Sequence, residues 1–256
     1  MLSNLKAHWY LLTRFRNGWH MVGCYRRGEP CAEAVLWEGR RLRHPRGRGG
    51  FVGTILEVWR EEPYSARGFY RPCDGDVVLD VGAHVGLFSL WLVRQNPRCR
   101  VVAIEPSTEN FACLQANVAA MGARQVSTYR YALGPRGGTG RVEPTTDRSI
   151  DHRLVPAPAS NADAVPILSL QDLLDVAGAD NVAMLKMDIE GAEYDVFAEV
   201  AQSTLRRVER LAVEYHDHLR PGTLNLIQQR LEPTHDVTIR PKKDEDYGVL
   251  LATRRS

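Results

Sequence analysis

The sequence predicts an α/β protein with a doubly wound, mostly parallel sheet. From Asp76 onward, short apolar runs alternate with segments of helical periodicity. These runs lack the polar alternation of a half-exposed strand, so we expect strands that are buried on both faces. The last two runs have no helix between them, which predicts an antiparallel hairpin at the C-terminal end.

Five apolar runs are expected to form the parallel part of the sheet: DVVLDV, CRVVAIE, QVSTYRYA, VAMLKMDI and VERLAVEYH. The closing hairpin is expected from HDVTIRP and YGVLLATR, which flank the charged turn KKDED. Between the strands, the periodicity predicts helices over residues 85–94, 109–121, 194–203 and 223–230. Ser107 is the expected N-cap of the second of these helices, and Gly122 is its expected C-terminal stop.

Two regions interrupt this alternation. Residues 134–166 contain nine Gly and Pro residues, so we expect a long irregular loop that is either a functional lid or disordered. Residues 1–72 hold 11 of the 20 aromatic side chains, and within them AVLWEGRRLRH predicts a hairpin and TILEVWREEPY a helix. We therefore divide the chain into an N-terminal aromatic and basic arm, residues 1–72, which makes substrate or dimer contacts, and a main domain, residues 73–256.

The composition is that of an ordinary globular chain, with 44% hydrophobic and 25% charged residues. No apolar run approaches membrane-spanning length and the N-terminal stretch is not a convincing signal peptide, so we expect a cytoplasmic protein with no membrane partner. The five Cys residues are odd in number and form no C-x-x-C pair. This favours free thiols over a disulfide framework or a zinc site.

The charge is unevenly distributed along the chain. Residues 1–73 carry 13 Lys and Arg against 6 Asp and Glu, a net charge of +7, and residues 74–256 carry 20 against 25, a net charge of −5. A basic arm on an acidic body would attract an anionic substrate or a nucleic acid. A solvated basic face is the simpler interpretation, and we favour it.

The stretch VVLDVGAHVGLFSLWL has the form of a strand, a glycine turn and a helix that hold a ligand. Asp80 ends the apolar run, and Gly82 and Gly86 provide the tight turn and the close packing of the helix. In a dinucleotide site a middle glycine lets the backbone approach a pyrophosphate, but Ala83 and His84 stand there instead. A ligand without phosphates fits this loop better. Glu105, at the tip of the second strand, is suited to accept hydrogen bonds from ribose hydroxyls.

Several motifs in order along the chain add specificity. VVLDVGAHVGLFS, VVAIEPSTENFACLQANVAAMG, VPILSLQDLL, MLKMDIEGAEYDVF and LAVEYH together resemble the FkbM-type family of class I S-adenosylmethionine-dependent methyltransferases. The likeness runs from about residue 75 to residue 216. It implies a Rossmann-like seven-stranded sheet, methyl transfer to oxygen, and a cofactor held by Gly82, Glu105 and their neighbours. His84 departs from the asparagine that is more usual in this family.

We therefore expect S-adenosylmethionine to bind along Asp80–Gly86, with its ribose on Glu105. Pro106 and Ser107 would shape that edge of the site. Tyr131 and Ala132, at the tip of the third strand, are weaker candidates for the wall beside the adenine.

The acid and base groups gather at the ends of the fourth and fifth strands. Asp188 and Glu190 share a strand face, as do Glu214, His216 and His218, and neighbouring strands would bring both groups together. One interpretation is a Mg²⁺ site formed by Asp188 with Glu214 or His216.

The other interpretation is a general base without a metal. The candidate catalytic residues are Asp188, Glu214, His216, Glu190 and, from the irregular loop, His152. The structural alternative is that Lys186 pairs with one buried carboxylate while the remaining groups cap helices.

The leading functional hypothesis is an O-methyltransferase acting on a saccharide hydroxyl, with a polyketide or macrolide hydroxyl as the alternative acceptor. An NAD-dependent oxidoreductase is disfavoured by the missing glycine. An RNA-binding methyltransferase would use the basic run RRLRHPRGR, residues 40–48. A non-catalytic binding module is less compatible with Gly82, Glu105 and Asp188. The arm is also a candidate surface for a homodimer.

Overall fold

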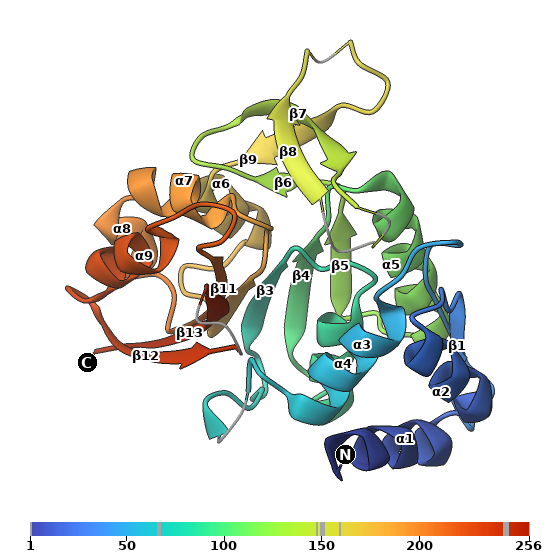
Figure 1. Cartoon of the computed structure of the whole chain (residues 1–256). Helices are drawn as coiled ribbons and strands as arrows, with labels where there is room; N and C mark the ends of the chain where they lie inside the picture. Colours follow the sequence, from blue (N-terminus) through green and yellow to red (C-terminus); the bar gives the residue numbers. More distant parts are fainter. Residues whose placement is uncertain are drawn as a thin grey trace.

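The computed structural model describes residues 2–65, 68–146, 148, 152–158, 160–242 and 246–255. A seven-stranded sheet with the order β12-β13-β11-β10-β3-β4-β5 forms its centre (Figure 1). The parallel strands are β3 (Val77–Val81), β4 (Arg100–Ile104), β5 (Val126–Tyr129), β10 (Met184–Met187) and β11 (Arg210–His216). β13 (Tyr247–Arg254) pairs antiparallel with both β11 and β12 (His235–Pro241). The predicted Rossmann-like α/β fold and its C-terminal hairpin are confirmed.

The strand order changes direction at β3. The chain continues from β3 to β4 and β5 on one side, and later adds β10 and β11 on the other. The loops after β3 and β10 therefore meet at the carboxyl ends of two neighbouring strands, where open α/β sheets bind ligands. Contact between these loops depends on Gly82, because a Cβ at this position would lie 1.8 Å from the main-chain oxygen of Asp188.

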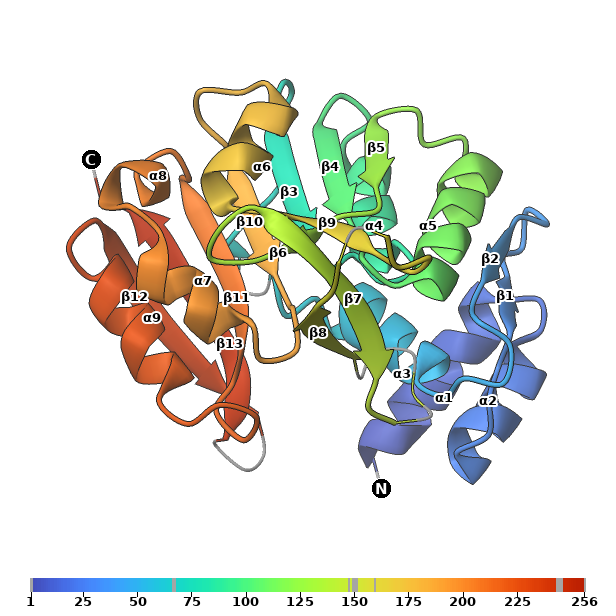
Figure 2. The same cartoon turned by 90° about the horizontal axis from the view of Figure 1, so that it is seen from above.

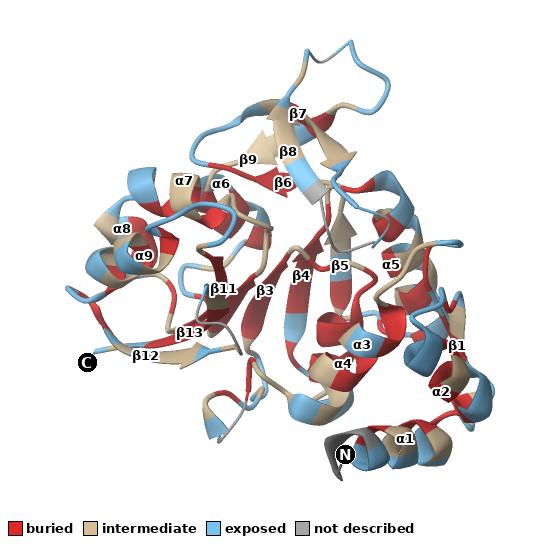
Figure 3. Cartoon of the chain, viewed as in Figure 1, coloured by how far each residue is buried: buried red, intermediate tan, exposed pale blue. Residues whose placement is uncertain are grey.

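Helices cover both faces of the large sheet. One face is covered by α4 (Leu87–Gln95), α5 (Thr108–Met121), α3 (Phe51–Ile55) and the π-helical segment η1 (Leu56–Glu61). The other is covered by α6 (Leu170–Ala177), α7 (Glu193–Glu199), α8 (Gln202–Leu205) and α9 (Thr223–Leu231). Alternate strand residues enter the two cores, and the central strands are buried along nearly their whole length (Figure 3).

Most of the predicted helices are confirmed. Ser107 accepts a hydrogen bond from the backbone N–H of Asn110 as the N-cap of α5, and Gly122 ends that helix in the left-handed conformation. The helix predicted over 194–203 is divided into α7 and α8, because Val200 and Ala201 are extended. None of the helices among the described residues is both long and apolar enough to cross a bilayer.

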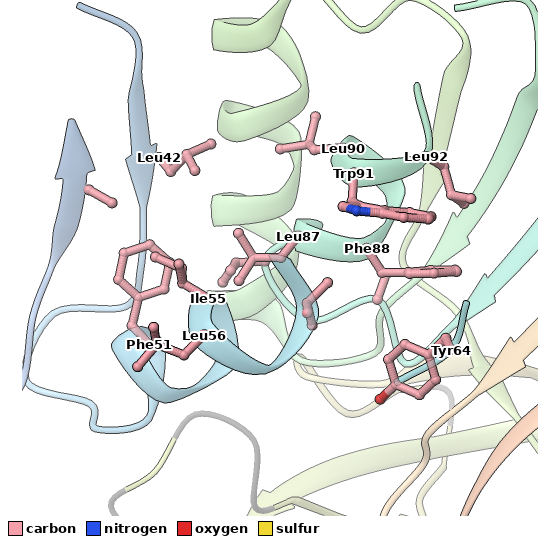
Figure 4. Close-up of a cluster of buried hydrophobic side chains, with 14 of the residues drawn as sticks. Leu42, Phe51, Ile55, Leu56, Tyr64, Leu87, Phe88, Leu90, Trp91 and Leu92 are labelled. Atoms are coloured by element: carbon pink, nitrogen blue, oxygen red, sulfur yellow. The ribbon is translucent and has the colours of Figure 1, made fainter. Parts of the chain in front are cut away.

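The N-terminal arm contains more helix than the sequence predicts. α1 (Leu2–Arg14) and α2 (Gly18–Arg27) precede the predicted hairpin, which is formed by β1 (Glu33–Val35) and β2 (Arg41–Arg43). The predicted helix follows as α3 and η1. The apolar side chains of these two segments belong to the same buried cluster as Leu87, Phe88 and Trp91 of α4 (Figure 4). The arm and one face of the sheet therefore share a single hydrophobic core.

The basic run of residues 40–48 is attached to α5 mainly through its backbone, and most of its arginine side chains are exposed. Asn117, a fully buried side chain of α5, accepts a hydrogen bond from the Arg43 N–H at 2.6 Å and donates to the Arg43 carbonyl at 2.9 Å. The Arg40 guanidinium donates to the Met121 carbonyl at 3.0 Å, and Arg48 pairs with Glu109. These contacts hold the hairpin against α5 and leave the side chains of Arg41, Arg43 and Arg46 exposed.

The prediction of a long irregular loop over residues 134–166 is wrong. The strands β6 (Ala132–Leu133), β7 (Gly138–Pro144), β8 (His152–Pro156) and β9 (Val165–Leu168) form a second sheet with the order β6-β9-β7-β8. Seen from above, β7 and β8 lie across the middle of the molecule (Figure 2). Some glycines serve strand packing here, because a Cβ at Gly134 would lie 2.7 Å from Ile167 and one at Gly140 would lie 2.9 Å from the Val155 carbonyl.

Candidate functional site

A pocket opens at the carboxyl ends of β3, β4 and β10, beneath the small sheet. Its volume is about 640 Å³ including the open space at its mouth, which is in the usual range for a small-molecule site. Val142 of β7 and Leu154 of β8 contribute to its lining, together with Asp188 and Glu190. We call it the cofactor pocket. Six of the predicted cofactor-binding residues line it: Gly82, His84, Glu105, Pro106, Tyr131 and Ala132.

Glu105 is a buried carboxylate at the wall of the cofactor pocket, with 5% of its surface exposed. Its Oε2 accepts a hydrogen bond from the His84 N–H at 2.8 Å, and its Oε1 accepts one from the Ser107 N–H at 3.0 Å. Burial raises the pKa of Glu105 to about 7, against the opposing effect of these two donors. Each oxygen keeps further acceptor capacity, which suits the two hydroxyls of a ribose.

The rest of the lining fits S-adenosylmethionine as well. Ile104, Pro106, Ala132 and Leu133 give an apolar wall beside the Tyr131 ring, which suits an adenine. The carboxylate of Asp188, which also lines the pocket, suits a positive charge of the cofactor.

Three predicted cofactor-binding residues, Asp80, Gly86 and Ser107, lie outside the pocket lining. Asp80 is fully buried in β3, where the Ser89 hydroxyl donates to its Oδ2 at 2.6 Å. Gly86 lies against α5, because a Cβ there would be 2.6 Å from Leu114 Cδ1. Ser107 caps α5 and donates its N–H to Glu105. These residues support the pocket from behind.

Lys186 joins the loop after β3 to β10. Its Nζ donates to the Gly82 carbonyl at 2.6 Å and lies 3.5 Å from Asp80 Oδ1 and 3.8 Å from Asp188 Oδ2. Burial pushes the pKa of Lys186 down, but the charges of Asp80 and Asp188 push it further up, so it stays protonated. The predicted pairing of Lys186 with a buried carboxylate is confirmed.

His84 occupies a left-handed backbone position, with φ of 52°. Asn, Asp and His adopt this conformation more readily than most residues other than glycine, which explains why asparagine or histidine stands there. The conformation directs the His84 N–H to Glu105. The imidazole of His44 approaches the His84 ring edge-on, with 5.6 Å between the ring centroids.

Glu193 holds the turn that follows β10, and sequence reasoning missed it. Its fully buried carboxylate accepts hydrogen bonds from the N–H groups of Ile189 at 3.0 Å and Gly191 at 2.8 Å. Glu190, between these residues, is left-handed with φ of 52°. The only signal in the sequence is a second acidic residue three positions after Glu190, inside the EGAE motif.

His216 lies among three carboxyl groups. Its Nδ1 is 3.0 Å from Glu193 Oε1, and its Nε2 is 3.6 Å from Glu190 Oε2 and 4.0 Å from Asp188 Oδ1. Burial lowers the pKa of His216, but the Glu193 hydrogen bond and the neighbouring charges together raise it to about 10. An imidazolium has no free lone pair for a proton, which argues against the predicted role of His216 as a general base at neutral pH.

Glu214 has a different set of partners from His216. The Lys242 Nζ lies 2.8 Å from Glu214 Oε1 and also pairs with Glu57, while the Tyr64 hydroxyl donates to Glu214 Oε2 at 3.0 Å. Tyr64 also lies 3.5 Å from Asp188 Oδ2, so its hydroxyl connects the two acidic residues. Tyr64, Lys242 and Glu57 are site residues that the sequence analysis missed.

Of the predicted Mg²⁺ ligands Asp188, Glu214 and His216, the structure brings Asp188 and His216 together, whereas Glu214 has other partners. In the part of the chain that the structure describes, Asp188, His216 and Glu193 have ligand atoms within 4.8 Å of one another. Glu193 takes the place predicted for Glu214. The backbone of His152 begins β8 opposite Pro144. The side chain of His152 lies outside the described residues, so its catalytic role stays a prediction.

A second pocket, of about 550 Å³ including open space, adjoins the cofactor pocket. We call it the acceptor pocket. The two pockets share Gly82, His84, Asp188 and Glu190. The acceptor pocket is otherwise lined by side chains from the arm, α4 and the ends of β10 and β11: Thr54, Glu57, Val58, Tyr64, Leu87, Phe88, Lys186 and Glu214, with Ala83 from the loop after β3.

Residues 80–232 match the model of the methyltransferase FkbM domain. The chain is 28% identical over 201 residues to the AMB antimetabolite synthetase AmbE of Pseudomonas aeruginosa, a match that covers 63% of this chain and only 9% of that protein. It is 27% identical over 197 residues to the 31-O-demethyl-FK506 methyltransferase FkbM of Streptomyces tacrolimicus, covering 63% of this chain and 73% of that protein.

A solved structure with a similar fold is a precorrin-6y C5,15-methyltransferase from Geobacter metallireducens, at 16% identity and a TM-score of 0.46, covering 77% of this chain and 89% of that chain. The family match spans more than half of the present chain. It includes the loop with His84, the buried Glu105 and the turn held by Glu193. The loop that contains His84 is therefore that of a methyltransferase and not that of an NAD-dependent oxidoreductase. The chain belongs to the FkbM-type family of S-adenosylmethionine-dependent methyltransferases.

Proposed function

We propose that the chain is an O-methyltransferase that transfers the methyl group of S-adenosylmethionine to a hydroxyl of a saccharide. The observation that carries this proposal is the junction of the cofactor and acceptor pockets at Gly82, His84, Asp188 and Glu190. Methyl transfer is an in-line displacement, so the attacking oxygen must approach the methyl carbon from the side opposite the sulfur. Two adjoining pockets provide these opposite sides. The bound cofactor supplies the electrophilic methyl group.

Asp188 is our proposed proton acceptor for the attacking hydroxyl. It lines both pockets, and 27% of its side chain is exposed. Glu190 lines the same junction, where burial and the neighbouring Asp188 charge raise its pKa to about 8. At neutral pH Glu190 is therefore mostly protonated and donates a hydrogen bond. A pair of carboxyl groups in different protonation states can position the substrate hydroxyl and take its proton.

The polar lining of the acceptor pocket supports a saccharide. Glu57, Lys186 and Glu214 offer hydrogen-bonding groups for several hydroxyls, while Tyr64 and Phe88 contribute aromatic rings for the apolar face of a sugar. A polyketide or macrolide hydroxyl is the second candidate acceptor. It is favoured by the relative that is named as a 31-O-demethyl-FK506 methyltransferase.

A divalent cation defines a second version of the site. Asp188, Glu193 and His216 have the oxygen and nitrogen donors for Mg²⁺ or a similar ion. Such an ion would compete with the proton on His216 and would lower the pKa of a nearby hydroxyl. Activity that survives EDTA would support the metal-free version. Loss of activity with EDTA, restored by Mg²⁺, would support the metal version.

The deciding experiment incubates the protein with labelled S-adenosylmethionine and separate oligosaccharide, polyketide and RNA pools, and identifies labelled products by mass. We expect labelled oligosaccharide and at least a 100-fold loss of rate for Asp188→Asn. The control Asp180→Asn, at an exposed position that lines neither pocket, should retain the wild-type rate. Label found only in the polyketide pool would overturn the saccharide proposal and support the second candidate acceptor, a polyketide or macrolide hydroxyl. Labelled RNA with salt-dependent binding would overturn both.

A further inference from the structure

Three potential metal ligands meet in the N-terminal arm and do not line the cofactor or the acceptor pocket. His20 and Cys24 lie one helical turn apart on α2, and Cys31 lies between the end of α2 and β1. One ring nitrogen of His20 and the two Sγ atoms all lie within 4.8 Å of one another. Cys24 and Cys31 are buried, whereas His20 is exposed at the surface.

The spacing of these atoms matches a tetrahedral metal centre. Zinc binds sulfur at about 2.3 Å and imidazole nitrogen at about 2.0 Å, so ligand atoms on a zinc tetrahedron lie about 3.3–3.8 Å apart. The Nε2 of His20 lies 3.5 Å from the Sγ of Cys24. Cys31 Sγ lies 3.4 Å from the Glu33 carbonyl, and a small rotation of its side chain would exchange that contact for the metal.

Space for a fourth ligand adjoins the cluster. Cys24 and Cys31 line a third pocket, of about 820 Å³ including open space, together with Tyr25, Gly28 and Glu29. The Glu29 carboxylate pairs with Arg27 at 2.8 Å, so it is not already turned toward the thiols. A water molecule would therefore complete the coordination.

We propose that His20, Cys24 and Cys31 form a zinc site with three protein ligands and an open fourth position. Thiolate and imidazole donors select zinc over magnesium or calcium. Binding at neutral pH releases the two thiol protons to solvent and forms two metal–sulfur bonds and one metal–nitrogen bond, with no change of oxidation state. The ion would tie the C-terminal half of α2 to the strand that enters the hairpin.

The proposed site has a ligand spacing that does not stand out in the sequence. The ligand spacing is H-x₃-C-x₆-C, with no C-x-x-C pair, so the sequence favoured free thiols. One helical turn places His20 and Cys24 on the same face of α2. The left-handed Gly28 ends α2 before Cys31. The chain turns after Gly28, and this turn brings Cys31 close to His20 and Cys24.

The test uses the full chain after dialysis against a chelator, titrated with Co²⁺ as a spectroscopic substitute for zinc. We expect one equivalent to give thiolate charge-transfer and tetrahedral d–d bands, and Zn²⁺ to displace it. Cys24→Ser and Cys31→Ser should each weaken the charge-transfer band by at least half, the double variant should lose it, and the exposed Cys73→Ser control should keep it in full. His20→Ala, at a surface position that does not threaten folding, should weaken Co²⁺ binding at least tenfold. Zn²⁺ should raise the melting temperature of the wild type but not of the Cys24→Ser variant.

Three results would overturn the proposal. The first is the absence of cobalt bands in the folded wild type, and the second is equal bands in wild type and Cys24→Ser. The third is a thiol titration of the unfolded, metal-free, unreduced protein that finds three reactive thiols, with all five of the chain restored by a reductant. If peptide mapping then identified the oxidised pair as Cys24 and Cys31, these residues would form a disulfide instead of a metal site. None of these results depends on methyl transfer, so they leave the proposed function untouched.

Discussion

Replacing Glu105 with glutamine tests the cofactor pocket most directly. The substitution keeps the size of the side chain but replaces one carboxylate oxygen with an NH₂ group that cannot accept a hydrogen bond. In the wild type the two oxygens accept from the N–H groups of His84 and Ser107 and have capacity left for the ribose. In Glu105→Gln, one of these N–H groups faces another donor, and one ribose hydroxyl loses its acceptor.

The expected loss of affinity follows from the hydrogen bonds. A bond to a charged group contributes about 1.5–3 kcal/mol and a neutral one about 0.5–1.5 kcal/mol. Losing one charged bond and weakening the other amounts to about 2–3 kcal/mol, and since about 1.4 kcal/mol is a factor of ten, Kd should rise about 30- to 150-fold. Calorimetry with S-adenosylmethionine at pH 8.5 is the measurement, because Glu105 is then ionised.

The matched control is Glu109→Gln, an exposed residue on α5 that pairs with Arg48. It should bind the cofactor with wild-type affinity. If Glu105→Gln bound within threefold of the wild type while remaining folded by circular dichroism, the ribose would not lie on Glu105, and the assignment of the pocket would fail.

The remaining predictions concern the pH dependence of cofactor binding and of stability, and substitutions in the turns that follow β3 and β10. Because the pKa of Glu105 is raised to about 7, protonation should weaken cofactor binding as pH falls below about 7, up to tenfold per pH unit, and calorimetry on Glu105→Gln should show no such dependence. The pKa of His216 is raised from about 6.5 in the unfolded chain to about 10 in the folded protein. The folded state is therefore stabilised by the bound proton, and this contribution to the free energy of unfolding is full below about pH 6.5 and is lost as the pH rises toward 10. Glu193→Gln should lower the free energy of unfolding by about 3 kcal/mol at pH 7 and flatten that decline in urea titrations, and an unchanged profile would contradict this. Gly82→Ala should abolish cofactor binding, because its Cβ would lie 1.8 Å from a carbonyl oxygen at a φ of 72°, whereas Gly138→Ala, with open space around it, should bind normally.

The sequence was sufficient to predict the large sheet. Its strands are buried on both faces, so they appear as continuous apolar runs, and α5 has both of its caps in Ser107 and Gly122. The small sheet was missed because its Gly and Pro residues have the composition of a loop. Gly140 is an example, because a side chain at this position would collide with the neighbouring strand. The amino-acid composition does not distinguish such a glycine from one in a loop.

The candidate site was only partly predictable for a different reason. Gly82, Glu105 and Asp188 follow strand ends, and the fold class alone brings such positions together. Tyr64 could not be found in this way, because its hydroxyl reaches Glu214 across 150 residues of sequence from a segment outside the sheet. A contact between residues so far apart in the sequence produces no periodic residue pattern from which it could be predicted.

The hydrophobic core shared by the arm and the large sheet limits how this domain can be recombined. The segment that matches the family, residues 80–232, contains neither α3 and η1, which pack against α4, nor β12 and β13, which complete the sheet. If that segment were transplanted into a larger enzyme, apolar surface of α4 and one edge of the sheet would be left open to water. A fusion or chimera should therefore take its boundaries from the whole chain, or its new host must supply an equivalent covering segment and two edge strands.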